Sequence, residues 1–473
     1  MLRSSFVLLI LIPGFFMALR DRFVALLMYL WFAFFKPQDW IWIDISSLRL
    51  SLVFGLVLVV PAIFSGIWPN LTHLLSVGNA LFLATAFVAH INAVDQAQSW
   101  YWVDFLTRLT LICLFTVSLV TTKQRLIWVL AVVAGSFGFH AGKAGVASLA
   151  GGGLRFAEGL TGAFADNNGY AMGTVMVIPL LLAVALNAHL LMDDPKAWQT
   201  KWIRRGFYAA IPACAFTVVS TFSRGGFLGL AAALLFYVAL HQKRVRLSMA
   251  GAAFVVLGLT FAPIPDGYFD RLETITNYEE IGEESAMSRT HFWEVAVVMA
   301  DARPLGVGLR NFGAEYDKYD FTYGRYGQHR DVHSSHFQVL SEQGVIGLAV
   351  WIGQFALAGW VALRVRRRSQ EPGVTPEDAH FMVSVSNCLS ASMAGFVIGG
   401  SFVSLALNDI TWLTFALLAA LDRMTRAMVV SQPVLAAVPE PRSVPRTLGS
   451  WKPPSRPIAA RLASGHAVQG KKS

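Results

Sequence analysis

Long uninterrupted apolar runs constrain the fold of this chain more than any other feature of its sequence. Stretches such as LVFGLVLVVPAIF carry no charge and no alternation of polar and apolar residues. Inside a bilayer every backbone N–H and C=O must be satisfied within the protein, so such runs form helices unless they close into a barrel, which would need that alternation. Hydrophobic residues make up 55% of the 473 residues and charged residues only 14%, far from the balance of soluble proteins. The sequence therefore predicts an all-α polytopic membrane protein.

A helix needs about 20 apolar residues to cross the hydrocarbon core. Windows of this kind predict about 12–13 transmembrane helices: 5–19, 23–35, 48–68, 72–92, 105–121, 125–141, 169–190, 206–222, 225–241, 247–264, 336–363, 380–402 and 404–421. The first window resembles the apolar part of a signal peptide, but no small-residue cleavage site follows it. We therefore expect it to stay in the protein as a membrane helix.

The short loops indicate the orientation, because loops rich in Lys and Arg are retained in the cytoplasm. The predicted spans put four basic clusters on one side: Lys123/Arg125, Lys201/Arg204/Arg205, Lys243/Arg244/Arg246 and Arg364 with Arg366, Arg367 and Arg368. That side is predicted to be cytoplasmic, and it includes a disordered basic tail at 426–473. The opposite, periplasmic side receives the loop 142–168, the SRGG turn and a long loop at 265–335.

The long loop mixes charged and aromatic residues. Within it, WEVAVVMADARPLGVG predicts an amphipathic helix that ends at Pro304 and the glycines. A disordered linker would not need Phe292, Trp293, Val297, Val298 and Met299, so we expect a folded lid. The predicted organisation is N-terminal membrane helices (1–141), core membrane helices (142–264), the periplasmic loop (265–335), C-terminal membrane helices (336–425) and the tail (426–473).

Arg224, in STFSRGGFLGL, lies between two apolar runs. A cation near the membrane is costly unless it has a partner. One interpretation is an arginine that snorkels to the interface. The other is an anion site, because the glycines permit close approach and the next helix offers free N–H groups. The anion most available at this depth is the phosphate of a lipid carrier.

The loop before residue 169 holds further polar candidates on the same face. Arg155, Asp166 and Asn168 occur in LRFAEGLTGAFADNNGYAMG, and Lys143 precedes them. An asparagine at the start of a helix is as often only a cap. Both roles stay open for Asn168.

Two histidines, His333 and His336, come directly before a predicted membrane helix, and Arg289 begins the predicted amphipathic helix. An imidazole can take a proton from an incoming hydroxyl, since its pKa lies near the working pH. Zinc is the rival interpretation, but no third ligand occurs at a useful spacing. Asp409 is a further candidate, since an acid in an apolar run either pairs with one of the arginines or lies at the water boundary.

Nothing in the sequence indicates a cofactor. The three cysteines, Cys113, Cys214 and Cys388, fall in separate apolar runs without CxxC or Cys/His spacing, so we expect small buried residues. No paired acidic metal motif occurs on the predicted outer face, which predicts metal independence.

Four segments resemble motifs of the bacterial O-antigen ligase and polymerase superfamily: RFAEGLTGAFADNNGYAM, STFSRGGFLGL, ESAMSRTHFWEVAVVMADARPLGVGLRNF and VHSSHFQVLSEQGVIGL. They occur in the order of that superfamily. The resemblance is closest to the O-glycosylation ligases found with exosortase A systems. It covers about residues 1–425.

The resemblance implies a GT-C-like membrane glycosyltransferase of the inner membrane. Such an enzyme transfers a glycan from undecaprenyl diphosphate to a hydroxyl acceptor, on a protein or a saccharide, at the periplasmic face. It implies that Arg224 and Arg289 hold the diphosphate, and that His333 rather than His336 is the base. The chain departs from relatives in AEGLTGAF, where a Gly-Pro turn is common, and in His336, where an aromatic residue is more usual.

Other functions remain open at this point. A polymerase of the same superfamily differs only in its acceptor. A lipid or solute transporter would also be polytopic, but it would usually show internal repeats and polar residues at the midplane, and we find neither. A scaffold for an export complex is the remaining alternative. Nothing indicates nucleic-acid binding.

Overall fold

The computed structural model describes residues 2–42, 45, 48–153, 156, 159–193, 196–241 and 284–430. Within these ranges every regular element is a helix and no strand occurs. The all-α prediction is therefore confirmed. Several predictions concern residues outside the described ranges: Arg155, the cluster Lys243/Arg244/Arg246, the span 247–264, residues 265–283 of the long loop and nearly all of the tail.

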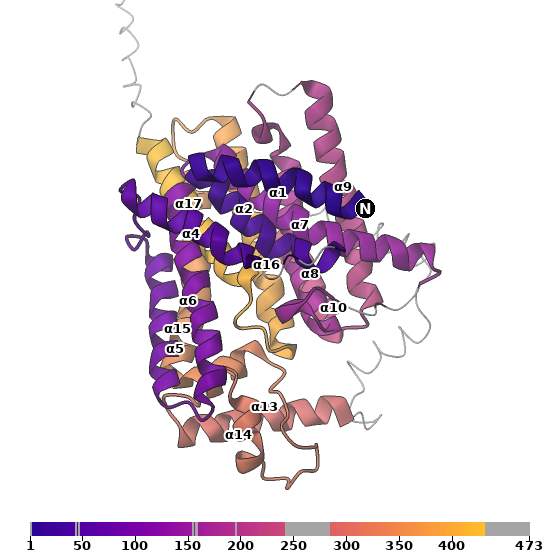
Figure 1. Ribbon diagram of the computed structural model, residues 1–473, viewed down its shortest axis with the longest axis vertical. Coiled ribbons are helices and arrows are strands. Elements are labelled where there is room, and N and C mark those ends of the chain that lie inside the picture. The colour runs from indigo at the N-terminus through magenta and orange to yellow at the C-terminus, as the bar shows by residue number, and fades with distance from the viewer. Residues whose placement is uncertain are drawn as a thin grey trace, which may run out of the picture. The chain divides into compact units, whose positions relative to one another are not determined.

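Helices occupy the apolar runs of the sequence (Figure 1). The first group is α1 (Leu2–Arg20), α2 (Arg22–Phe35), α3 (Pro37–Trp40), α4 (Leu50–Phe64), α5 (Leu74–Ile91), α6 (Gln96–Leu119) and α7 (Lys123–Ala150). The second is η2 (Gly162–Phe164), α8 (Asn167–Leu186), η3 (Ala188–Leu191), α9 (Ala197–Ser220) and α10 (Arg224–Leu240). The third is α13 (Glu284–Ala302), α14 (Phe312–Tyr319), α15 (Ser335–Arg368), α16 (Pro376–Gly399), η4 (Gly400–Phe402) and α17 (Asp409–Val430).

Seven described helices are long and apolar enough to cross a membrane: α1, α5, α6, α7, α8, α15 and α16. Three further apolar helices, α2, α4 and α10, are shorter, and α9 and α17 have 24 and 22 residues. Every predicted window except 247–264 coincides with one of these helices. The full number of crossings stays a prediction.

Basic residues gather at one end of the helical bundle. Lys123, at the start of α7, donates to Asp378 Oδ1 at the start of α16 over 2.8 Å. Lys123 and Arg204 are both charged neighbours of His189, and Arg366 donates to the last carbonyl of α10 over 3.1 Å. The three basic clusters that the structure describes therefore share this end, which we call the basic end.

A buried carboxylate organises part of the basic end. Asp422 is 0% exposed and accepts hydrogen bonds from Arg364 and Arg368, the latter at 2.8 Å. Arg426 Nη2 and His73 Nε2 lie 3.3 and 3.2 Å from the same carboxylate. These contacts join α17 to α15 and to the start of α5, so arginines predicted to set the topology also tie helices together.

Small residues bring α10 and α16 close together. A Cβ added to Gly229 would lie 3.0 Å from the carbonyl oxygen of Gly395, and one added to Gly395 would lie 3.1 Å from Ala233 Cβ. Near the start of α10, Gly225 faces Gly399 in the same way. Small residues four positions apart let helix backbones approach closely within a membrane. The glycines after Arg224 therefore have a packing role.

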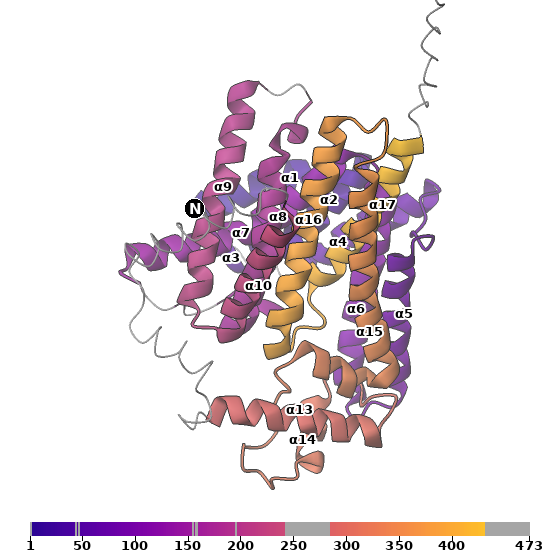
Figure 2. The same cartoon turned by 180° about the vertical axis from the view of Figure 1, so that it is seen from behind.

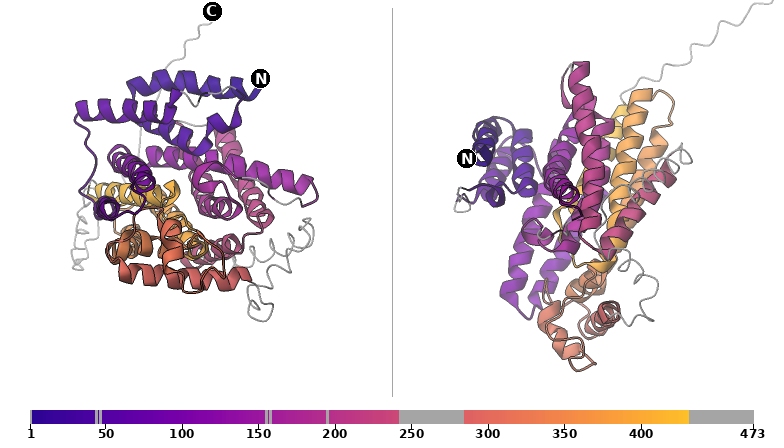
Figure 3. Two further views of the ribbon diagram at one scale, coloured as in Figure 1. Left: turned by 60° about the horizontal axis from the view of Figure 1, so that its bottom comes forward. Right: turned by 90° about the vertical axis from the view of Figure 1, so that its right-hand side faces the viewer.

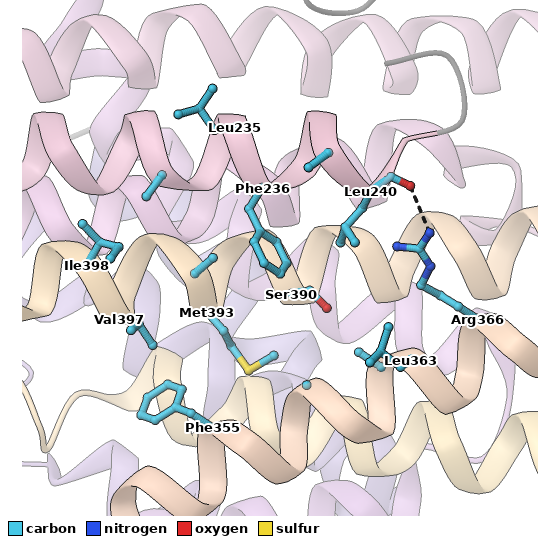
Figure 4. Close-up of a pocket in the computed structure, with 15 residues that line it drawn as sticks. Leu235, Phe236, Leu240, Phe355, Leu363, Arg366, Ser390, Met393, Val397 and Ile398 are labelled. Atoms are coloured by element: carbon cyan, nitrogen blue, oxygen red, sulfur yellow. Dashed lines mark hydrogen bonds between the residues drawn. The ribbon is translucent and has the colours of Figure 1, made fainter. Parts of the chain in front are cut away.

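An open apolar cavity of about 670 Å³ lies between α10 and α15 (Figure 4). Phe236 and Leu240 of α10, Phe355 and Leu363 of α15 and Met393 of α16 are among the residues that line it. Arg366 lies at the end of the cavity that is nearest the basic end of the bundle, where it donates to the carbonyl oxygen of Leu240 (Figure 4).

The part of the predicted lid that the structure describes, residues 284–334, is folded and lies at the other end of the bundle (Figure 3). Helix α13 ends at Ala302, before Pro304 as expected, and lies with α14 across the ends of α5, α6 and α15 (Figure 2). The lid has its own apolar core, which contains Phe292, Met299 and Tyr316. Val297 and Val298, which also suggested a buried face, are 41% and 43% exposed.

A kink at Gly344 fixes the lid to α15. Gly344 has φ 72° and ψ −171° inside the helix, a conformation that L side chains rarely adopt. Its hypothetical Cβ would lie 1.9 Å from the carbonyl oxygen of Pro304. The residues after α13 thus press on the kink, and only glycine fits there.

Candidate active site

Three helices begin at the end of the bundle opposite the basic end. Asp166 caps α8, where its Oδ1 accepts hydrogen bonds from the backbone N–H groups of Asn168 and Gly169 over 2.9 and 3.0 Å. Ser223 caps α10 through a bond from Gly226 N over 3.1 Å. Ser334 is the cap residue of α15. Each helix start therefore lies directly beside a residue that the sequence analysis selected.

Hydrogen bonds join the first two helix starts. Ser223 Oγ donates to Asn168 Oδ1 over 2.8 Å. Asn167 Nδ2 donates to the carbonyl oxygen of Thr221 over 3.0 Å. The DNN and SRGG segments, 55 residues apart between Asn168 and Ser223, thus form one structural unit. Asp166, and not Asn168, is therefore the cap of α8. A binding role for Asn168 stays a prediction.

Arg224 is the first residue of α10 and is half-buried. The two glycines after it contact protein: Gly225 packs on Phe402, and a Cβ on Gly226 would lie 2.7 Å from Ala171 Cβ. The start of α10 is therefore fixed against α8 and the end of α16. This packing holds the backbone of Arg224 in place.

His333 lies on the short segment before α15 in a strained backbone conformation. Its φ is 49°, a left-handed value that costs a non-glycine residue free energy. The neighbouring Ser335 holds the segment, because its Oγ donates to Val403 O over 2.7 Å and accepts from Leu405 N over 3.0 Å. Such strain is commonly found where a side chain must point in a defined direction.

Charged residues from two other segments surround His333. Burial lowers the pKa of its imidazole, and the positive charges of Arg289 and Arg330 lower it further. The carboxylates of Asp331 and Asp166 act in the opposite direction. The net shift is downward, so the imidazole is neutral near pH 7 and can accept a proton. The structure thus brings together His333, Arg289 and Asp166, three residues selected from separate motifs.

His336 has a different environment. Its Nδ1 accepts a hydrogen bond from Trp351 Nε1 over 3.0 Å, and its Nε2 lies 2.9 Å from the carbonyl oxygen of Val397. Because the indole N–H can only donate and the carbonyl can only accept, both ring nitrogens are engaged and the tautomer is fixed. His336 therefore joins helices, and His333 is the stronger candidate for a base.

Two other candidates lie apart from this cluster. The charged neighbour of Lys143 is Arg3 of α1. Asp409, at the start of α17, has Lys36 as its charged neighbour, and its role in the site stays a prediction. Lys36 also donates to the carbonyl oxygen of Thr161.

Several residues near His333 were not predicted from the sequence. Arg330 and Asp331 occur three and two positions before His333 in HRDVH, and their closeness in sequence was an available signal. Phe292 was treated only as a core residue, yet its ring centroid lies 6.1 Å from that of His333, and the Arg330 guanidinium lies 5.8 Å from its centre.

The arrangement offers cationic side chains beside a neutral imidazole at the ends of membrane helices. Arginine can hold phosphate oxygens with two parallel hydrogen bonds, and the imidazole can remove a proton from a hydroxyl. Among the described residues, no group of three or more His, Cys, Asp or Glu side chains is arranged to hold a metal ion. Anion binding coupled to proton transfer is the chemistry that these residues support.

A multi-pass membrane protein with such a site matches known families over two regions. Residues 209–352 match the sequence model of a family described as O-Antigen ligase. Residues 2–194 match that of a family of unknown function. No curated protein matches the chain. The first match contains Arg224, Arg289 and His333, and it supports placing the chain in the O-antigen ligase superfamily.

Proposed function

We propose that this chain is a membrane glycosyltransferase of the O-antigen ligase type. It transfers a glycan from undecaprenyl diphosphate to a hydroxyl acceptor on the periplasmic face of the inner membrane. The observation that carries this proposal is the position of His333 directly before α15, beside Phe292 and Arg330 and with Arg289 as a further charged neighbour. The match of residues 209–352 supports the class of enzyme.

In the proposed reaction the acceptor hydroxyl gives its proton to His333. Its oxygen then attacks the anomeric carbon of the donor sugar, and the bond from that carbon to the phosphate oxygen breaks. Undecaprenyl diphosphate leaves with the electron pair, and the configuration at the carbon is inverted. Arg289 and Arg224 would neutralise the charge that develops on the diphosphate, with hydrogen bonds worth about 1.5–3 kcal/mol each. No metal is required in this scheme.

The other predicted ligands enter the proposal to different degrees. Asn168 accepts the hydrogen bond that fixes Ser223 at the start of α10, and Asp166 is a charged neighbour of the imidazole. Lys143 is left out because its charged neighbour is Arg3. Arg155 stays a prediction from the sequence.

Transfer in membranes loaded with lipid-linked glycan tests the proposal. His333→Ala and Arg289→Ala should each reduce transfer by at least about 100-fold, since acid–base catalysis and oxyanion stabilisation each contribute on that order. Arg367→Ala is the control, because Arg367 is exposed and lies near the basic end of α15. Full transfer by both site variants would overturn the proposal.

A polymerase, which joins one lipid-linked repeat to another, shares the superfamily and the chemistry. Analysis of the reducing end of the product separates the two. Attachment to protein or to a lipid-borne saccharide supports a ligase, whereas longer carrier-linked chains support a polymerase.

The association with exosortase systems, and so protein O-glycosylation, is part of our proposal. Deletion in the host should then remove glycan from secreted or surface proteins. Proteoliposomes that translocate lipid or solute without transfer would support a transporter instead.

A further inference from the structure

A short loop between α14 and His333 exposes aromatic side chains to solvent. We call residues 320–327, with the sequence DFTYGRYG, the aromatic loop. Tyr323 is 97% exposed and Phe321 is 51% exposed. An aromatic ring that exposes nearly all of its surface contributes almost nothing to the core, so the fold does not explain why Tyr323 is there.

The aromatic loop is nevertheless held in one conformation. Asp320 accepts hydrogen bonds from Thr322 N and Oγ1 over 2.9 and 2.7 Å, and from Gly324 N over 2.7 Å. His291 Nε2 lies 2.8 Å from the same carboxylate. Burial acts to raise the pKa of Asp320, but these bonds outweigh it and lower the pKa to about 2. The carboxylate is therefore charged at any physiological pH and holds the loop throughout.

The backbone of the aromatic loop is also strained at Tyr323. Tyr323 has φ 54°, while Gly324 and Gly327 have φ 86° and 90°. For tyrosine this left-handed conformation is strained. A strained residue that points into solvent suggests selection for what its side chain contacts.

The aromatic loop reaches the candidate base through one shared ring. Tyr326 and Phe292 have ring centroids 6.3 Å apart with planes at 82°. Phe292 is in turn a neighbour of His333 and of Arg330. The aromatic loop is therefore linked to His333 and Arg330 through the ring of Phe292.

We infer that the aromatic loop binds sugar rings of the lipid-linked donor, beyond the sugar that reacts. This inference rests on the proposed function. A sugar ring has faces made of C–H groups, which are attracted to the negative face of an aromatic ring. The exposed Arg325 and Arg330 add forked donors for sugar hydroxyl or carboxylate oxygens.

The donor fits this surface better than the acceptor, because the diphosphate of the donor anchors its sugars near the site. Its diphosphate is fixed by Arg289 and Arg224 in the proposed function, so its outer sugars must leave the site through the water-exposed residues next to His333. The aromatic loop lies there.

The test compares two donors in the same transfer assay. One is an undecaprenyl diphosphate that carries a single sugar, and the other carries the full oligosaccharide. Tyr323→Ala should raise KM for the oligosaccharide donor about 5-fold, which is the scale of one aromatic contact, and leave kcat unchanged. Its KM for the single-sugar donor should not change, because that donor does not reach the loop. Phe321→Ala should behave in the same way.

Tyr101→Ala is the matched control, since Tyr101 is 63% exposed near the start of α6. An equal rise in KM for both donors would overturn the inference and indicate a structural or membrane-anchoring role. A rise in KM for the acceptor alone would overturn it as well, as would no change. In each of these outcomes a loss of transfer in His333→Ala leaves the proposed function standing. If His333→Ala retains full transfer, the proposed function itself fails.

Discussion

Ser223 donates a hydrogen bond to Asn168 over 2.8 Å, and this bond joins the starts of α10 and α8. The same hydroxyl caps α10 through Gly226 N. Arg224 therefore stands on a helix start that is fixed to the DNN segment. We therefore expect the position of the Arg224 guanidinium to depend on the hydrogen bond that the preceding residue, Ser223, makes to Asn168.

Ser223→Ala should destabilise the protein by about 1 kcal/mol, because it removes a helix cap. It should also reduce transfer more than this loss explains, since Arg224 is no longer held. Thr122→Ala is the control: Thr122 caps α7 through Arg125 N at the basic end, so it should lower stability without lowering transfer at a permissive temperature. Thermal unfolding and transfer rates measure both. Equal effects of the two variants on transfer would contradict the coupling.

Transfer should fall on the acid side with a midpoint below the ordinary histidine pKa of about 6.5. The reason is that the base must be neutral, and burial together with Arg289 and Arg330 lowers the pKa of His333. Arg330→Gln removes a positive charge and should move the midpoint upward. Asp331→Asn removes a negative charge and should move it downward. The pH profile of kcat/KM measures these shifts. His329→Gln is the control and should leave the midpoint in place, because this side chain is 72% exposed. Shifts of the same sign in Arg330→Gln and Asp331→Asn would refute the assignment of the titrating base to His333.

Asp422→Ala should destabilise the protein by about 3–5 kcal/mol, because it leaves arginines near a buried position without their carboxylate. The partners are Arg364, Arg368 and Arg426, with His73 beside them. Asp104→Ala is the matched control, since its pair with Arg108 is about half exposed and should contribute at most about 1 kcal/mol. Thermal unfolding in detergent compares the two. Similar losses of stability in the two variants would show that the buried ion-pair cluster stabilises the protein no more than the exposed pair does.

Gly344→Ala should destabilise α15 severely, because a Cβ there would lie 1.9 Å from Pro304 O and the φ of 72° disfavours any side chain. Gly353→Ala tests the same change in the same helix. Nothing lies within 4 Å of its hypothetical Cβ, so alanine should stabilise by about 0.5–1 kcal/mol. Expression level and unfolding temperature report both. An equally tolerated Gly344→Ala would mean that the kink is not needed.

Much of the fold could be predicted because an apolar run without period-2 alternation can satisfy its backbone hydrogen bonds inside a membrane only as a helix. The end of α13 before Pro304 and the gathering of the basic clusters follow from similarly local rules. His333 could be selected as a candidate base from its place before a predicted membrane helix and from the resemblance to the O-antigen ligase superfamily. The role of His336 did not, since Trp351 lies 15 residues further along the chain and only packing brings them together.

The charged neighbour of Asp409 could not be predicted from the sequence for the same reason. Its charged neighbour, Lys36, lies at the end of α2 near the other end of the chain. Hydropathy shows that a charge in an apolar run needs a partner, but it does not show which partner. The aromatic loop was missed because exposure is a property of the folded surface, and the sequence shows only that aromatic residues are present.

The bond between Ser223 and Asn168 also has an evolutionary consequence. Asn168 belongs to the region that matches a family of unknown function, and Ser223 belongs to the region that matches O-antigen ligases. The candidate site therefore contains residues from both matched regions, which meet at this hydrogen bond. A chimera that takes one half from a relative should fold its helices and still lose transfer unless the two halves are matched at this contact.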